Sequence, residues 1–257
     1  MRRAILPFLF GLLALGAAPA AFGAGETACW FDHGAIVVPA AFGNIAGDFL
    51  LDAATLKSEL HVTNAQSFGI LAPSARADLR LAGRRLPNFE MTVTDLGARE
   101  RPFVAGLVGV IGADALAGFV TEIEINPCRV RLSRRAGQPW PIRLPLKTIS
   151  GALAVPAAIS DGAASRTGWF AVATGQPGVT VAGAKLTREP SKEGDPDWPP
   201  ARLRAVSLGG LLFEQVPAGV SDQPSPGLAG SIGEAIWSRY RMRLDPARGI
   251  LSLAPIR

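Results

Sequence analysis

Histidine, cysteine and long apolar segments are scarce in this chain of 257 residues. Its only histidines are His33 and His61, and it has two cysteines, too few for a typical zinc site. The glycines of 106–112 fall at every third residue, unlike the G-x-G-x-x-G pattern of dinucleotide-binding turns. Beyond the first 20 residues, no apolar run reaches the ~20 residues that a membrane-spanning helix needs. We therefore expect no metal, no cofactor and no membrane-embedded domain.

The net charge of the chain is also small. The chain has 26 Lys plus Arg against 21 Asp plus Glu, a net charge of +5, and the basic residues are scattered. Nucleic-acid-binding surfaces usually gather such residues into a stripe or patch. The composition therefore argues against a nucleic-acid partner.

The first residues have the pattern of an export signal. Met1, Arg2 and Arg3 form a basic start, residues 4–17 are almost wholly apolar, and residues 18–20 are Ala-Pro-Ala. This predicts a signal peptide at 1–20, with cleavage between residues 20 and 24; an uncleaved anchor is the alternative. Cleavage would lower Lys plus Arg to 24 and the net charge to +3. We expect a periplasmic or secreted protein that leaves the membrane after cleavage.

Export bears on the two cysteines, Cys29 and Cys128. An oxidising compartment favours a disulfide between them, and two buried free thiols are the alternative. Such a bond would join the start of the mature chain to the end of its first half.

The rest of the composition indicates a mainly β protein. Gly and Pro are frequent, at 29 and 21 residues, and aromatic residues make up only 7%. Short runs of Val, Ile and Leu are separated by turn residues, which is typical of strands joined by tight turns.

A strand pattern occurs twice. Residues Ala35–Phe42 contain Val-Pro-Ala-Ala, and so do residues Ala152–Ile159. Each is followed by a turn and a second apolar strand, Phe49–Thr55 in the first copy and Trp169–Gly175 in the second. In this alignment Ala173 takes the place of Asp52.

The ends of the two copies also agree. Ile111-Gly112 and Ile232-Gly233 each precede a short helical piece and two further strands, and the interval from Asp52 to Gly112 equals that from Ala173 to Gly233, 60 residues. Two copies indicate two lobes related by a pseudo-twofold axis, since a solenoid needs at least three repeats. We assign 25–135 to the first lobe, 136–150 to a linker and 151–257 to the second lobe. Asp114 and Glu234 are expected to cap or solvate the short helices.

A strand ending in Leu-Leu-Asp, followed about sixty residues later by Ile-Gly, resembles the retropepsin-like and pepsin-like aspartic proteases. The resemblance covers nearly all of the mature chain, once per lobe. It implies a mainly β, two-lobed acid-protease architecture with an active cleft between the lobes. In that family two Asp carboxylates, one per lobe, share a proton, so that one acts as base on water and the other as acid.

The resemblance makes Asp52 the catalytic candidate and assigns active-site turns to residues 52–55 and 173–175, with Ile111, Gly112, Ile232 and Gly233 in support. The family pattern has Thr or Ser and then Gly after each Asp. The first lobe has Ala53 and Ala54 there, followed by Thr55, whereas the second lobe keeps Thr174 and Gly175 but has Ala173 for the Asp. Each lobe lacks what the other retains.

This pattern predicts a catalytically impaired monomer that binds an extended polypeptide between its lobes. An active endopeptidase using Asp52 is the alternative. Activity could return if Asp161 reached the cleft in another register, if two chains paired their Asp52 residues, or if Asp52 served a different hydrolysis.

Overall fold

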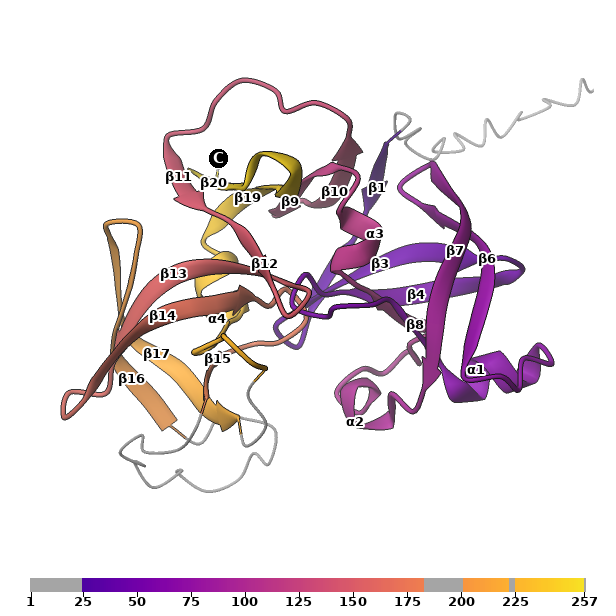
Figure 1. Cartoon of the computed structure of the whole chain (residues 1–257), viewed down its shortest axis with the longest axis horizontal. Helices are drawn as coiled ribbons and strands as arrows, with labels where there is room; N and C mark the ends of the chain where they lie inside the picture. The colour runs from indigo at the N-terminus through magenta and orange to yellow at the C-terminus, as the bar shows by residue number, and fades with distance from the viewer. Residues whose placement is uncertain (1–24, 183–200, 222–224, 257) are drawn as a thin grey trace, which may run out of the picture.

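The computed structural model describes residues 25–182, 201–221 and 225–256, so the predicted signal peptide lies outside the described residues. The structure is mainly β, as predicted. Two barrel-like lobes lie side by side, and a third sheet joins them along one edge (Figure 1). No helix in the described ranges is long and apolar enough to cross a bilayer.

The first lobe is a seven-stranded sheet in the order β2-β3-β4-β8-β5-β7-β6. Strand β3 also pairs with β6, so six of the strands close into a barrel. The strands are β2 (Trp30–Asp32), β3 (Ala35–Phe42), β4 (Ile45–Leu51), β5 (Glu59–His61), β6 (Ser74–Leu81), β7 (Arg84–Thr94) and β8 (Gly109–Ile111).

The second lobe repeats this topology strand for strand, in the order β12-β13-β14-β18-β15-β17-β16, and β13 pairs with β16 to close it. Its strands are β12 (Lys147–Ile149), β13 (Ala152–Ser160), β14 (Ser165–Val172), β15 (Val179–Ala182), β16 (Ala201–Leu208), β17 (Leu211–Ser221) and β18 (Gly230–Ile232). The duplication predicted from the repeated tetrapeptide is therefore present in the fold.

The third sheet is shared, and it lies at the top of Figure 1. Its order is β1 (Glu26–Ala28), β10 (Cys128–Ser133), β9 (Val120–Ile125), β19 (Tyr240–Asp245), β20 (Ile250–Pro255) and β11 (Ile142–Pro145). The lobes join where β9 pairs with β19, for example at Ile123 and Met242. The segment predicted as a linker, 136–150, contributes β11 to this sheet and β12 to the second lobe.

The helices are short, and two of them are equivalent. α3 (Ala113–Leu116) and α4 (Glu234–Trp237) follow the two Ile-Gly pairs, as the sequence predicts. The others are α1 (Val62–Ser67), α2 (Gly97–Glu100) and the 3-10 turn η1 (Pro246–Arg248).

The repeated proline has a common explanation in both lobes. Pro39 lies between the part of β3 that pairs with β2, Ala35–Val37, and the part that pairs with β6, Ala40–Phe42. Pro156 lies at the matching point of β13. Only one neighbouring strand is paired there, which is where a residue without an N–H is best tolerated in a sheet.

Cys29 and Cys128 form the predicted disulfide, with their Cα atoms 5.0 Å apart. It ties the junction of β1 and β2 to the start of β10, across 99 residues of sequence. Closing a loop of this length contributes about 2–5 kcal/mol to stability, largely by restricting the unfolded chain. The first lobe is thereby fixed to the shared sheet.

Candidate active site

Asp52 directly follows β4 at the junction of the lobes, and only 5% of it is exposed. Strand β4 pairs in parallel with β8, and the Asp52 N–H donates to the Ile111 carbonyl at 2.9 Å. The second lobe is built identically, because the Ala173 N–H donates to the Ile232 carbonyl at 2.9 Å. Ala173 thus occupies the position equivalent to Asp52.

The glycines after these isoleucines allow the close packing. A Cβ on Gly112 would lie 2.8 Å from the Thr55 carbonyl oxygen, and one on Gly233 would lie 2.4 Å from that of Gln176. Each helix can therefore pack directly against the turn of its own lobe.

Two symmetric backbone bonds hold the turns of the two lobes together. The Ile36 N–H donates to the Thr174 carbonyl at 3.0 Å, and the Leu153 N–H donates to the Ala53 carbonyl at 3.1 Å. The first-lobe turn, residues 52–55, and the second-lobe turn, residues 173–176, therefore face each other across the pseudo-twofold axis.

In the described part of the chain, only the second-lobe turn supplies a side chain that hydrogen-bonds to the other turn. The fully buried Thr174 hydroxyl donates to the Leu51 carbonyl at 2.7 Å and accepts from the Ala53 N–H at 3.2 Å. Ala53, at the equivalent position in the first lobe, has no hydroxyl to return this bridge. One threonine thus links both lobes.

Gly175 brings the second-lobe turn against Asp52. A Cβ at this position would lie 2.8 Å from the Asp52 Cβ and 3.0 Å from the Leu50 side chain, so a larger residue could not be accommodated without movement. At the equivalent position Ala54 instead donates its N–H to Asp52 Oδ1 at 3.1 Å.

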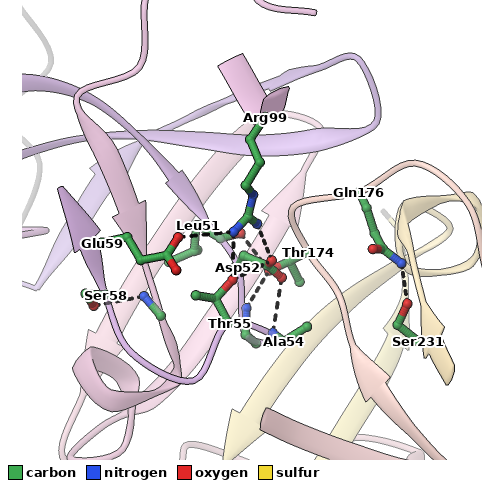
Figure 2. A network of polar contacts seen from close by, with 12 residues as sticks. Leu51, Asp52, Ala54, Thr55, Ser58, Glu59, Arg99, Thr174, Gln176 and Ser231 are labelled. Carbon is green, nitrogen blue, oxygen red and sulfur yellow. Dashed lines mark hydrogen bonds and ion pairs between the residues drawn. The ribbon is translucent and has the colours of Figure 1, made fainter. Parts of the chain in front are cut away.

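The Asp52 carboxylate is fully engaged within its own lobe. Oδ2 accepts from the Thr55 hydroxyl at 2.9 Å and from Arg99 Nη2 at 2.5 Å. Figure 2 shows the Arg99 side chain reaching onto Asp52, and Arg99 Nη1 also donates to the Thr55 hydroxyl at 3.0 Å. An ionised carboxylate with a charge-assisted partner of this kind is strongly held.

Arg99 has a second acidic neighbour. The carboxylate of Glu59, on β5, lies 3.6 Å from Arg99 Nη1, on the side of the guanidinium away from Thr174 (Figure 2). Burial raises the pKa of the Glu59 carboxyl above its usual value; Arg99 opposes this rise, and the charges of Asp52 and Asp114 add to it. Arg99 therefore lies between two carboxyl groups of one lobe.

Arg99 comes from a segment anchored at both ends, residues 95–108, which we name the strap. Glu100 accepts from the Leu107 N–H at 2.9 Å and lies 3.1 Å from His61 Nε2. Leu96, Phe103 and Leu107 pack on an apolar cluster formed with Ala35, Val37, Leu50 and Val110. The strap thus places Arg99 over Asp52 through both polar and apolar contacts.

The expectations for the two helix acids had different outcomes. Asp114 accepts from the Ser58 hydroxyl at 2.7 Å and from the Ser58 N–H at 3.0 Å, so it caps a loop of the first lobe. Glu234 does not cap or contact solvent: it is 1% exposed, and neither carboxyl oxygen has a hydrogen-bond partner among the described residues. That prediction was wrong because position 234 faces the interior.

Asp161 lies away from this junction. It follows the Ser160–Ser165 pair at the tip of the β13–β14 hairpin, where it accepts from the N–H groups of Ala163 and Ala164. The Asp52 contacts are at the other end of β14, about 25 Å along the strand at ~3.3 Å per residue. The alternative register through Asp161 therefore has no support in the geometry. Among the described residues, no group of His, Cys, Asp and Glu is arranged to hold a metal ion.

The architecture has solved counterparts. The crystal structure of an aspartic proteinase from Irpex lacteus matches with a TM-score of 0.54, covering 90% of this chain and 97% of that one. The chain has the aspartic protease fold. The two sequences are 13% identical, so the likeness is one of fold alone. No protein-family model and no curated protein sequence matches the chain.

Within this fold, sequence reasoning missed Arg99 and Glu59, and it named Glu234 without predicting its burial. Arg99 lies 47 residues after Asp52, in a charged stretch between two strands, and no spacing connects the two. The one available signal was that a buried Asp needs a partner, and this did not identify which of the many arginines supplies it.

Proposed function

We propose that this protein is an exported member of the aspartic protease fold that binds extended polypeptide between its lobes and does not hydrolyse it efficiently. The observation that carries the proposal is the pairing of Asp52 with Arg99, opposite Ala173. Two-acid catalysis needs one carboxyl group to activate water and another to protonate the substrate. Here one acid is neutralised by an arginine and the other is absent.

The arrangement also leaves little room for water activation. Asp52 is 5% exposed, and its two oxygens already accept three hydrogen bonds. General acid–base help is typically worth ~10²–10⁴-fold in rate, so losing it removes most of the activity.

Polypeptide is the proposed ligand by analogy with the solved aspartic proteinase that has this fold. An extended segment would pair with exposed strand edges and place alternate side chains in the cleft. Export is supported by the apolar N-terminal segment and by the Cys29–Cys128 disulfide, a bond typical of oxidising compartments.

A peptide-library digest from pH 3 to pH 8 tests the catalytic half of the proposal, with Asp52→Asn as the matched variant. We expect no Asp52-dependent cleavage by the parent chain. A library-binding experiment with the same two proteins tests the other half, and both should retain the same set of peptides. Acid-favoured cleavage that disappears in Asp52→Asn would overturn the proposal in favour of an active endopeptidase.

A further inference from the structure

Glu234 is the least satisfied acid in the described part of the chain. It is the first residue of α4, it is 1% exposed, and both of its carboxyl oxygens are buried without a hydrogen-bond partner in that part. An ionised carboxylate in such a place would cost several kcal/mol. Burial accordingly raises the pKa of the Glu234 carboxyl well above its usual value, and the charge of Asp52 raises it further.

Glu234 sits directly beneath the second-lobe turn. Its N–H donates to the Gln176 carbonyl at 3.0 Å, and the Ala235 N–H donates to the Pro177 carbonyl at 2.8 Å. Gly233 packs against the same segment without space for a Cβ. This turn carries Thr174 and Gly175, the residues that bridge to Leu51 and Ala53 and that contact Asp52. A single turn of chain therefore separates the two acids.

Burial is the main cause of the raised pKa of Glu234, and the charge of Asp52 adds to it. The elements packed against α4 are β17, β18 and β19, and their other ionisable groups are exposed or engaged elsewhere. Glu214 is exposed, Tyr240 contacts the Phe213 ring, Arg241 lies over Trp140, Arg243 pairs with Glu122, and Asp245 accepts from the Arg248 N–H.

The equivalent position in the first lobe is Ala113, which is buried and apolar. Packing beneath an active-site turn therefore does not require an acid. The second lobe lacks an acid at 173 and has one at 234, where its first-lobe equivalent has none.

We propose that Glu234 is the second acid of the Asp52 site: a carboxyl group buried under the second-lobe turn without a hydrogen-bond partner among the described residues, where it positions that turn against Asp52. The site then has one acid per lobe: Asp52, which pairs with Arg99, and Glu234, which has no hydrogen-bond partner among the described residues. Because Glu234 is 1% exposed, it is a positioning residue and not a substitute for the missing catalytic acid. This proposal rests on the proposed function and adds a residue that controls the position of the second-lobe turn, which joins the lobes. Its test needs no ligand.

The direction of the effect follows from linkage. An acid whose pKa is raised by folding stays protonated in the folded state while the unfolded chain ionises. Stability contributed by protonated Glu234 is therefore complete below the unfolded-state pKa of about 4.3 and is lost as the pH rises toward the folded-state pKa. Above that pKa, the ionised group must be hydrated, which disturbs α4 and the turn above it.

The test is a carboxyl ¹³C NMR titration of the full mature chain labelled at glutamate, with Glu234 assigned by the signal missing in Glu234→Gln. We expect Glu234 to titrate well above the exposed glutamates. In Asp52→Asn its midpoint should move to lower pH, and in Arg99→Ala, where Asp52 loses its cation, to higher pH. The fully buried Trp237 on the same helix gives an optical readout of the same step.

Thermal unfolding from pH 4 to pH 9 gives the independent measurement. The parent and the exposed-residue control Glu214→Gln should both lose stability as the pH rises, and Glu234→Gln should lose less. A Glu234 midpoint near that of exposed glutamates, or one unmoved by both Asp52→Asn and Arg99→Ala, would overturn the inference. Both measurements are made without peptide, so they can fail or succeed independently of the polypeptide-binding experiment.

Discussion

The two lobes share a fold, but their turns at the lobe junction have different roles. In the first lobe the turn residues are Asp52, Ala53 and Ala54, and the charge is compensated locally by Arg99. In the second lobe the same positions hold a buried Ala, Thr and Gly, and the turn supplies the side-chain bridge and the close contact between lobes. Duplication thus allows one copy to keep the charge and the other to keep the packing.

The difference extends along the adjoining strands. Position 59 is Glu in the first lobe, and its equivalent, Thr180, hydrogen-bonds to Ser231 in the second. The first lobe covers its turn with the strap. The second lobe places neutral polar groups there, with Gln176 also donating to Ser231 (Figure 2). The two lobes therefore share one strand order and differ in their charges and in the strap.

The largest expected effect comes from making the lobes alike. Ala173→Asp completes the Asp-Thr-Gly motif in the second lobe, and Arg99→Ala frees Asp52 in the first. We expect the double variant to cleave a fluorogenic peptide library below pH 6 at ~10²-fold or more above the parent, because a two-acid pair supplies general acid–base help.

Adding Asp52→Asn to the double variant is the control and should return cleavage to the level of the parent. Each single variant should gain less than the double variant. Circular dichroism and thermal melting show whether the double variant folds. If it folds but cleaves no faster than the parent, other residues besides these two also prevent catalysis.

Much of this comparison could be predicted from the sequence. The repeated Val-Pro-Ala-Ala and the equal 60-residue intervals identified both copies, because the strands and turns of a duplicated fold repeat locally. The disulfide followed from the cysteine count and the predicted export. The placement of Ala173 opposite Asp52 followed from the alignment, because backbone bonds fix both turns in the same way.

The rest depends on contacts that no local pattern encodes. The shared sheet pairs β9 with β19, about half the chain apart, and part of the predicted linker joins it as β11. Arg99 belongs to the strap, which has no repeated motif in the second lobe to compare. Glu234 follows a glycine at a helix start, a position that is usually solvated, but the second-lobe turn and strands β17, β18 and β19 pack against α4, and Glu234 is buried.

The second prediction tests the one-sided bridge. Thr174→Val keeps the side-chain shape but leaves the Ala53 N–H and the Leu51 carbonyl without their partner inside the lobe junction. A buried polar group left unpaired costs about 1–3 kcal/mol, so we expect a loss of that size in the free energy of unfolding measured in urea. The control is Thr167→Val, an exposed threonine on β14, which should change stability little. Equal effects of the two variants would show that the bridge is not a significant link between the lobes.

The smallest expected effect concerns Glu59, the charged counterpart of Thr180. Burial raises the pKa of Glu59, so the folded state resists its ionisation and stability is lost as the pH rises above the unfolded-state value. Glu59→Gln should match the parent below about pH 4 and be more stable at pH 7, by up to ~0.5 kcal/mol in urea unfolding. The gain in stability should be larger in an Arg99→Ala background, because Arg99 opposes the rise in the pKa of Glu59.

Glu90→Gln, on a more exposed ion pair with Arg76, is the control and should show no gain in stability toward neutral pH. A Glu59→Gln variant less stable than the parent at pH 7 would mean that the contact with Arg99 outweighs the cost of burial, and that the first lobe gains stability from this charge.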